Sequence, residues 1–330
     1  MTAVRSPRAV SLQPPAVRPR PASGPVDVPS APDTVRRLTA ATLAHVGHFW
    51  RLTKPKVVGA IVFTALVGVL LASAGTPPVR IAAFGCLGIW LAAASAAAFN
   101  HVLDRRLDAL MTRTRFRPLP RGQLTESSAV AFAAVLAVAS MLVLVVEVNV
   151  LTAALTFASL VGYSVVYTVW LKHATPQNIV IGGAAGAAPP ALGWVAVTGH
   201  LDPDALALFL IIFIWTPPHF WALAIARRDE YAKAGVPMLP VTHGTAITAK
   251  YVLLYTILLS AVAIVPYLTA MSGPVYLAGA VLLSARFVLH AIELNRNPGA
   301  VCGMRTFRFS IHYLLLLFTL LLADHYLKYR

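Results

Sequence analysis

Long apolar stretches alternate with short polar ones along the chain from about residue 56 to its end. Each apolar stretch is close to the roughly 20 residues that an α-helix needs to cross the hydrocarbon core of a bilayer. The pattern predicts an all-α, polytopic membrane protein with nine membrane-spanning helices. The predicted spans cover residues 56–74, 79–100, 128–146, 150–171, 178–198, 204–226, 250–270, 275–295 and 308–327.

Two of the predicted spans contain a pair of prolines, Pro189 with Pro190 and Pro217 with Pro218. Proline lacks a backbone N–H, so a carbonyl of the preceding turn loses its helical partner. Such positions are tolerated at membrane depth where neighbouring groups or a cavity supply other partners. We therefore expect both helices to border a cavity inside the bundle.

Composition supports a membrane protein and changes how the charge is interpreted. Hydrophobic residues make up 58% of the chain and charged residues only 12%, whereas about 25% is usual for soluble domains. The net charge of +15 suggests a polyanionic partner, but the basic residues concentrate in the N-terminal region and in the loops that follow even-numbered spans. By the positive-inside rule these parts are cytoplasmic and the C-terminus is outside. We predict no nucleic-acid partner.

The first 50 residues differ from the remainder because they are rich in proline and arginine and lack the apolar core of a signal peptide. We predict a disordered cytoplasmic tail over residues 1–50 and one membrane domain over residues 51–330. A mitochondrial presequence is the weaker alternative, since prolines break the amphipathic helix that it requires. The missing presequence and the Ala/Val/Arg-rich composition favour a bacterial plasma membrane.

A row of polar residues follows the second predicted span. Asn100, Asp104 and Asp108 are spaced four apart, which places them on one face of a helix. Two carboxylates at this spacing repel each other unless a cation lies between them, and oxygen ligands of this kind suit Mg²⁺ together with substrate phosphates. Arg113 and Arg117 follow and are suited to bind phosphate oxygens. The alternative is a solvated helix extension in which the aspartates pair with arginines.

A second group begins inside the sixth predicted span. His219 follows a proline pair at membrane depth and is a candidate base, a ligand or a hydrogen-bonded interior residue. Asp229 lies in the following loop, on the same side of the membrane as the first acidic row. Its alternative role is an ion pair with Arg227 or Arg228.

A third group surrounds the end of the fourth predicted span. Lys172 and, before the first span, Lys54 lie at a depth where they would meet a diphosphate. Tyr163 and Tyr167 are candidate pocket residues, although interfacial aromatic residues are commonly membrane anchors. Asn178 belongs to the same group, at the start of the fifth predicted span.

One further set of ionisable residues lies within the eighth predicted span. Arg286, His290 and Glu293 share a helix face, and such a set at membrane depth is by default a functional hypothesis. An internal pair between Arg286 and Glu293 is an equally good explanation, so we keep the trio outside the predicted site. The two cysteines, Cys86 and Cys302, are expected at different depths and therefore form no disulfide.

Four stretches carry a family resemblance that runs from about residue 51 to residue 330. Asn100-x3-Asp104-x3-Asp108, followed by Arg113 and Arg117-Pro-Leu-Pro, resembles the first signature of the UbiA superfamily of membrane prenyltransferases. The stretches 167–183, 215–224 and 231–240 are similar to the branch of that superfamily that farnesylates haem. In most of the superfamily the second signature is rich in aspartate, and this sequence departs from it, which leaves the second set of metal ligands open.

The resemblance implies nine helices around a central cavity that opens sideways to the lipid bilayer. It implies Mg²⁺-dependent transfer of a farnesyl group from farnesyl diphosphate to the vinyl group of haem b (protoheme IX), which gives haem O for haem–copper terminal oxidases. Haem b is then a substrate and not a cofactor. A haem A synthase or an oxidase assembly factor is an expected partner.

The resemblance also suggests a role for each matching residue. The expected catalytic residues are Asp104, Asp108 and His219. The expected metal ligands are Asn100, Asp104, Asp108 and Asp229. The expected diphosphate-binding residues are Lys54, Arg113, Arg117 and Lys172. The expected pocket residues, which surround the farnesyl chain and the acceptor, are Tyr163, Tyr167, Asn178, Trp215, Phe220 and Trp221.

Three other functions fit parts of the sequence. Another UbiA-type enzyme would prenylate a quinone precursor or a chlorophyll-like acceptor. A transporter would also have broken helices and ionisable residues near the midplane, but we find no second copy of the 100–122 pattern. A haem-binding scaffold without catalysis would not need an acidic row beside arginines.

Overall fold

The computed structural model describes residues 31–73, 75 and 78–328. Its internal contacts divide the chain into a unit of residues 1–43 and a unit of residues 44–330, and the helical bundle belongs to the second unit. Nine spans are recognised among the described residues when one bent pair of helices, Thr42–Leu52 with Pro55–Leu71, is included as one of them. The all-helical, multi-span fold predicted from the apolar pattern is confirmed.

The helices follow the predicted spans closely. Those that cross the bundle are α2 (Pro55–Leu71), α3 (Val79–Leu103), α5 (Glu126–Glu147), α6 (Val150–Val161) with the π-helix η1 (Gly162–Leu171), α8 (Asn178–Ala187) with α9 (Pro189–Thr198), α10 (Pro203–Ala226), α13 (Thr245–Val262) with α14 (Val265–Leu268), α15 (Pro274–Arg296) and α16 (Ala300–Lys328). The short helices are α4 (Arg105–Leu110), α7 (Lys172–Ala174), α11 (Arg228–Lys233) and α12 (Leu239–Thr242).

The boundary predicted at residue 50 lies inside helix α1 (Ala31–Leu52). No proline occurs between Pro32, in the first turn of this helix, and Pro55. Its last turns also pack, since the rings of Phe49 and Phe132 lie 5.0 Å apart and Leu52 is fully buried. Residues 1–30 of the predicted tail lie outside the described residues.

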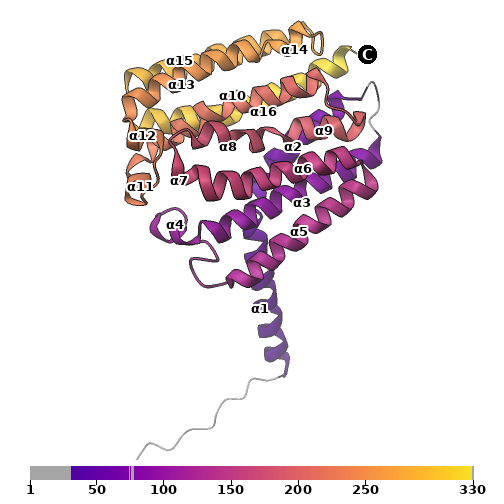
Figure 1. Cartoon of the computed structure of the whole chain (residues 1–330), viewed down its shortest axis with the longest axis vertical. Coiled ribbons are helices and arrows are strands. Elements are labelled where there is room, and N and C mark those ends of the chain that lie inside the picture. Colours follow the sequence, from indigo (N-terminus) through magenta and orange to yellow (C-terminus); the bar gives the residue numbers. More distant parts are fainter. Residues whose placement is uncertain (1–30, 74, 76–77, 329–330) are drawn as a thin grey trace, which may run out of the picture. The chain divides into compact units, whose positions relative to one another are not determined.

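Within the bundle, α3 packs against α5, α2 against α9, and α10 against α8, α13 and α16. Figure 1 shows these helices stacked side by side, with α3 and α5 towards one edge and α13 and α15 at the other. Small residues allow the closest crossings, as expected for helices in a membrane. At Gly193 of α9 a side chain would occupy the place of the Ala65 carbonyl oxygen of α2.

Three irregularities in the helices lie at one end of the bundle, where Figure 1 also shows α4, α7, α11 and α12. Helices α1 and α2 meet at a 51° bend, and α3 gives way to α4 at Asp104. The third is η1, in which the Thr168 hydroxyl donates to the Tyr163 carbonyl at 2.8 Å. Single π-helical turns widen a helix and are frequent at functional sites.

Candidate active site

Asn100, Asp104 and Asp108 lie on one helical face, as their spacing predicts. The chain changes from α3 to α4 at Asp104, yet the helical hydrogen bonds continue through the junction. The Asp104 amide donates to the Asn100 carbonyl at 2.9 Å, and the Asp108 amide donates to the Asp104 carbonyl at 2.8 Å. All three side chains are buried, with exposed fractions of 5%, 6% and 4%. We call these three residues the polar row.

Basic side chains from three separate segments neutralise the polar row. Lys172 lies 2.6 Å from Asp104, and Arg117 donates to Asp108 at 2.7 Å. Lys54 donates to the Asn100 side-chain oxygen at 2.5 Å, while the Asn100 amide donates to Asp104 at 2.8 Å. Buried carboxylates require such partners because an unpaired charge is costly away from water. Of the alternative, a solvated helix extension with aspartate–arginine pairs, the structure shows the pair of Asp108 with Arg117, but the row is buried and Asp104 pairs with a lysine.

Lys54 reaches the row through an unusual backbone conformation. It lies in the break between α1 and α2 with φ 49° and ψ 58°, the left-handed region that side chains other than glycine rarely adopt. Proline at position 55 begins α2 and disfavours the ordinary helical conformation for the residue before it.

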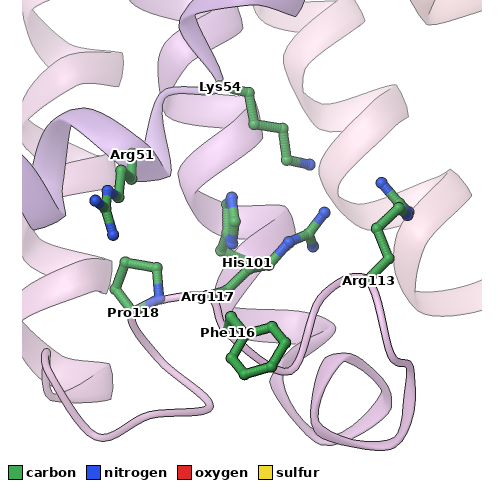
Figure 2. Close-up of a pocket in the computed structure, with 7 residues that line it drawn as sticks. All are labelled: Arg51, Lys54, His101, Arg113, Phe116, Arg117 and Pro118. Carbon is green, nitrogen blue, oxygen red and sulfur yellow. The ribbon is translucent and has the colours of Figure 1, made fainter.

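A pocket of about 250 Å³ lies beside the row. Figure 2 shows the side chains that line it, with the imidazole of His101 in the middle of the group. The lining residues are Arg51, Lys54, His101, Arg113, Phe116, Arg117 and Pro118. Burial lowers the pKa of the Arg113 guanidinium. Sequence analysis missed His101, although its place next to Asn100 at the inner end of a span was an available signal.

The second cluster surrounds His219 on α10. Its ring stacks on Trp215 with centroids 4.1 Å apart and lies 4.6 Å from the ring of Phe307 on α16. The hydroxyl of Ser310 lies 2.6 Å from His219 Nδ1, and the Ser310 carbonyl accepts from Trp215 Nε1 at 2.8 Å. The edge of Phe220 contacts the same imidazole at 4.9 Å. Ser310 and Phe307 could not be found from the sequence, because nothing in it says which face of the last helix meets His219.

Trp221, predicted to line the substrate pocket, packs into the core instead. It is 1% exposed, and its ring lies 5.3 Å from Tyr255 and 5.9 Å from Tyr251, both on α13. Neighbouring positions on a helix point about 100° apart, so Trp221 faces α13 while Phe220 remains 40% exposed. Trp221 therefore belongs to the packing of α10 against α13.

The residues predicted around the end of the fourth span are brought close to Lys172. Tyr163 and Tyr167 stack with ring centroids 5.5 Å apart along η1. Asn178 is fully buried at the start of α8, and its side chain donates to the Lys172 carbonyl at 3.3 Å. Gly182 makes room for Tyr167, because a side chain at that position would overlap the tyrosine ring.

The structure does not bring Asp229 to the polar row. Its side chain is 87% exposed and lies 3.8 Å from Arg228. In the part of the chain that the structure describes, no group of three His, Cys, Asp or Glu side chains is placed to hold a metal ion. The polar row alone still offers oxygen ligands that fit Mg²⁺, which typically binds one or two carboxylates and completes its shell with water and phosphate.

The trio on α15 also separates. Glu293 pairs with Arg305 of α16 at 2.5 Å rather than with Arg286, which is exposed. His290 is buried against Phe309, with ring centroids 4.7 Å apart. These contacts join α15 to α16 and explain the three residues as packing and surface groups.

The geometry is that of a membrane prenyltransferase, and comparison with known proteins shows the family. The family model described as the UbiA prenyltransferase family matches residues 61–321, so the chain belongs to this family. A protein of Methylococcus capsulatus named protoheme IX farnesyltransferase is 58% identical over 285 residues, covering 85% of this chain and 96% of the relative. A protein of Photobacterium profundum with the same name is 57% identical, covering 85% of this chain and 90% of the relative.

Solved structures show the same fold at low sequence identity. A digeranylgeranylglyceryl phosphate synthase superposes with a TM-score of 0.73 at 16% identity, covering 86% of this chain and 99% of that chain. A UbiA homologue of Archaeoglobus fulgidus bound to DMAPP and Mg²⁺ superposes with a TM-score of 0.56 at 16% identity, covering 83% and 98%.

Proposed function

We propose that the protein transfers the farnesyl group of farnesyl diphosphate to the vinyl group of haem b and so makes haem O for haem–copper terminal oxidases. The observation that carries this proposal is the buried polar row, with Lys172 on Asp104 and Arg117 on Asp108. The identity of 58% to a protoheme IX farnesyltransferase supports the choice of substrates. A haem A synthase or an oxidase assembly factor is the partner class that this product implies.

The polar row is the proposed Mg²⁺ site, with Asn100, Asp104 and Asp108 as ligands. When bound, Mg²⁺ neutralises negative charge on the diphosphate leaving group. Lys54, Lys172 and Arg117, which contact the polar row, would bind phosphate oxygens of the diphosphate when the row holds the metal. Arg113 adds a further guanidinium beside the same pocket. These donors favour departure of the diphosphate, since they act where negative charge develops.

The reaction begins when the C1–O bond of the farnesyl diphosphate breaks and the electron pair leaves with the diphosphate. The faces of Tyr163 and Tyr167, stacked beside Lys172, are placed to stabilise the allylic cation. The haem vinyl group then forms the new carbon–carbon bond, and a water molecule adds to the haem-side cation and loses a proton. The product carries a hydroxyethylfarnesyl chain.

The aromatic cluster on α10 and α16 is the proposed contact surface for the porphyrin. Trp215, Phe220 and Phe307 surround His219 with apolar faces. Because His219 Nδ1 is held by Ser310, its Nε2 is the nitrogen available to contact haem or to accept the proton released from water. In this proposal His219 acts on the haem acceptor and takes no part in binding the diphosphate.

The proposed function is tested by chromatography of the haems from cells that express the full chain. Asp104→Ala and Asp108→Ala should each abolish haem O, while the protein still inserts into the membrane. Glu147→Ala is the matched control, because this carboxylate pairs with Arg80 in another part of the bundle. Haem O at a near-normal rate in both aspartate variants would contradict the proposed mechanism. Prenylation of 4-hydroxybenzoate but not of haem b would instead identify another UbiA-type enzyme.

A further inference from the structure

His101 is a buried polar side chain whose hydrogen-bonding groups are unused. It lies in the last turn of α3 and is 3% exposed. Neither of its ring nitrogens has a hydrogen-bond partner among the described residues. Buried polar groups in proteins almost always have a partner, so each exception needs an explanation.

The composition of the surrounding pocket gives that explanation. The charged side chains that line it with His101 are Arg51, Lys54, Arg113 and Arg117, and all four can only donate hydrogen bonds. The remaining lining side chains belong to Phe116 and Pro118, which offer no acceptor. The N–H of a neutral imidazole therefore has no acceptor in this wall, and a ligand rich in acceptor oxygens would supply one.

Two of these donors also contact the polar row. Lys54 bonds to Asn100 and Arg117 to Asp108, so both side chains stand between the row and the pocket. Figure 2 shows Lys54 and Arg113 on different sides of His101, around the space that the pocket encloses. A ligand that spans from the row into this pocket would meet the metal ligands at one end and only donors at the other.

We propose that the neutral imidazole of His101 donates a hydrogen bond to an oxygen of the terminal phosphate of the prenyl diphosphate, in the subsite that the basic side chains of this pocket form. The inference rests on the proposed function, which supplies a diphosphate substrate. Arg51 contributes charge at the rim, where its side chain is exposed. Filling the subsite gives His101 its missing acceptor and draws Lys54 and Arg117 away from the row, which frees the row for the metal.

A simple packing role for His101 is less satisfactory. An apolar side chain of similar size would fill the same volume without leaving two polar atoms unpaired. Four basic side chains around one small pocket also repel one another, and an anion removes that repulsion. The phosphate of a lipid headgroup has the same chemistry as the terminal phosphate, so the experiment must separate these two sources.

The test uses inorganic pyrophosphate as a competitive inhibitor of the full-length enzyme in detergent, with Mg²⁺, farnesyl diphosphate and haem b. His101→Ala should raise the inhibition constant of pyrophosphate and the KM for farnesyl diphosphate about tenfold, as expected when a hydrogen bond to a charged group is lost. The KM for haem b should not change. His101→Gln, which restores an N–H donor, should recover most of the loss. His200→Ala, an exposed histidine in the loop between α9 and α10, is the matched control.

An unchanged inhibition constant in His101→Ala overturns the proposal, and so does an equal rise in the KM for both substrates. If His101→Ala does not accumulate, Arg51→Gln tests the proposal in the same assay. Loss of the charge at the rim must raise the inhibition constant of pyrophosphate several-fold, and an unchanged inhibition constant overturns the proposal. Inhibition by phosphatidylglycerol vesicles that His101→Ala removes, with no inhibition by pyrophosphate, would assign the pocket to lipid and overturn the proposal. Pyrophosphate could raise the thermal stability of the wild-type protein but not that of His101→Ala, while the wild-type protein makes no haem O. This result would support the subsite and contradict the proposed function.

Discussion

Each buried carboxylate of the polar row has one basic partner, and each partner comes from a different part of the chain. Lys172 follows η1, whereas Arg117 lies in the loop after α4. Neither basic residue lies on the same helix as its carboxylate, so each pair depends on how separate segments of the chain pack. In the proposed mechanism the same two cations first neutralise the carboxylates of the row and then bind the diphosphate.

Lys172 provides the sharpest test of this exchange. Lys172→Met leaves Asp104 with only the Asn100 amide as a partner. We expect kcat to fall about 10²- to 10³-fold, because a donor aimed at the leaving group is lost. The same variant should bind Mg²⁺ more tightly before substrate is added, since no cation competes for Asp104. Steady-state kinetics and Mg²⁺ titration measure the two effects, and Lys172→Arg, which keeps the charge, should lose less activity.

A loss of activity in Lys172→Met together with weaker Mg²⁺ binding would contradict the exchange. It would mean that Lys172 supports the structure of the polar row and does not compete with Mg²⁺ for Asp104. Unchanged kcat would remove Lys172 from the diphosphate site altogether.

At the scale of helices, the site depends on positions where regular helix geometry is interrupted. η1 places Tyr163 and Tyr167 together, and α8 must lie close to η1 so that Asn178 can hold the Lys172 carbonyl. Gly182 permits this approach. Packing between these two elements therefore positions both an aromatic pair and a cation.

Gly182→Ala tests this packing. The added methyl group would overlap the ring of Tyr167, so either the ring or α8 must move. We expect a loss of about 1–3 kcal/mol in stability, typical of overpacking, and a higher KM for farnesyl diphosphate. Gly186→Ala, on the same helix, meets nothing within 4 Å and is the matched control. Thermal unfolding and kinetics that do not distinguish the two variants would show that Tyr167 has no fixed position in the site.

At the scale of the whole molecule, the nine spans could be predicted because each must be apolar over a length that the bilayer fixes. The polar row was predictable because residues four apart share one face of a helix, and the helical hydrogen bonds continue through the junction at Asp104. His101 could not be singled out, because one histidine beside a motif does not indicate which groups surround its ring. Ser310 could not be predicted, because its contact with His219 depends on how two distant helices rotate against each other. The exposed side chain of Asp229 does not join the row, because a loop on the same side of the membrane as a site need not turn its side chains towards it.

The charges predict the direction of the bundle across the membrane, and this prediction can be tested on the intact chain. Basic residues gather in the loops at the end that carries the site, so this end should face the cytoplasm and the C-terminus should be outside. In a variant without Cys86 and Cys302, a cysteine at Arg121 should react with a membrane-impermeant maleimide only after the cells are opened. A cysteine at His200, which is 69% exposed, should react in intact cells.

The reverse labelling pattern would place the diphosphate site outside the cytoplasm and contradict the orientation. The pattern matters for function, because a charged diphosphate does not cross a bilayer unaided, whereas its prenyl chain and a porphyrin can both enter the bundle from the lipid. With the proposed substrates, a cytoplasmic site would bind the diphosphate group from water while the prenyl chain and the porphyrin are taken up from the membrane. The same argument explains why the charged half of the site lies at the helix ends, while the aromatic cluster around His219 lies within a span.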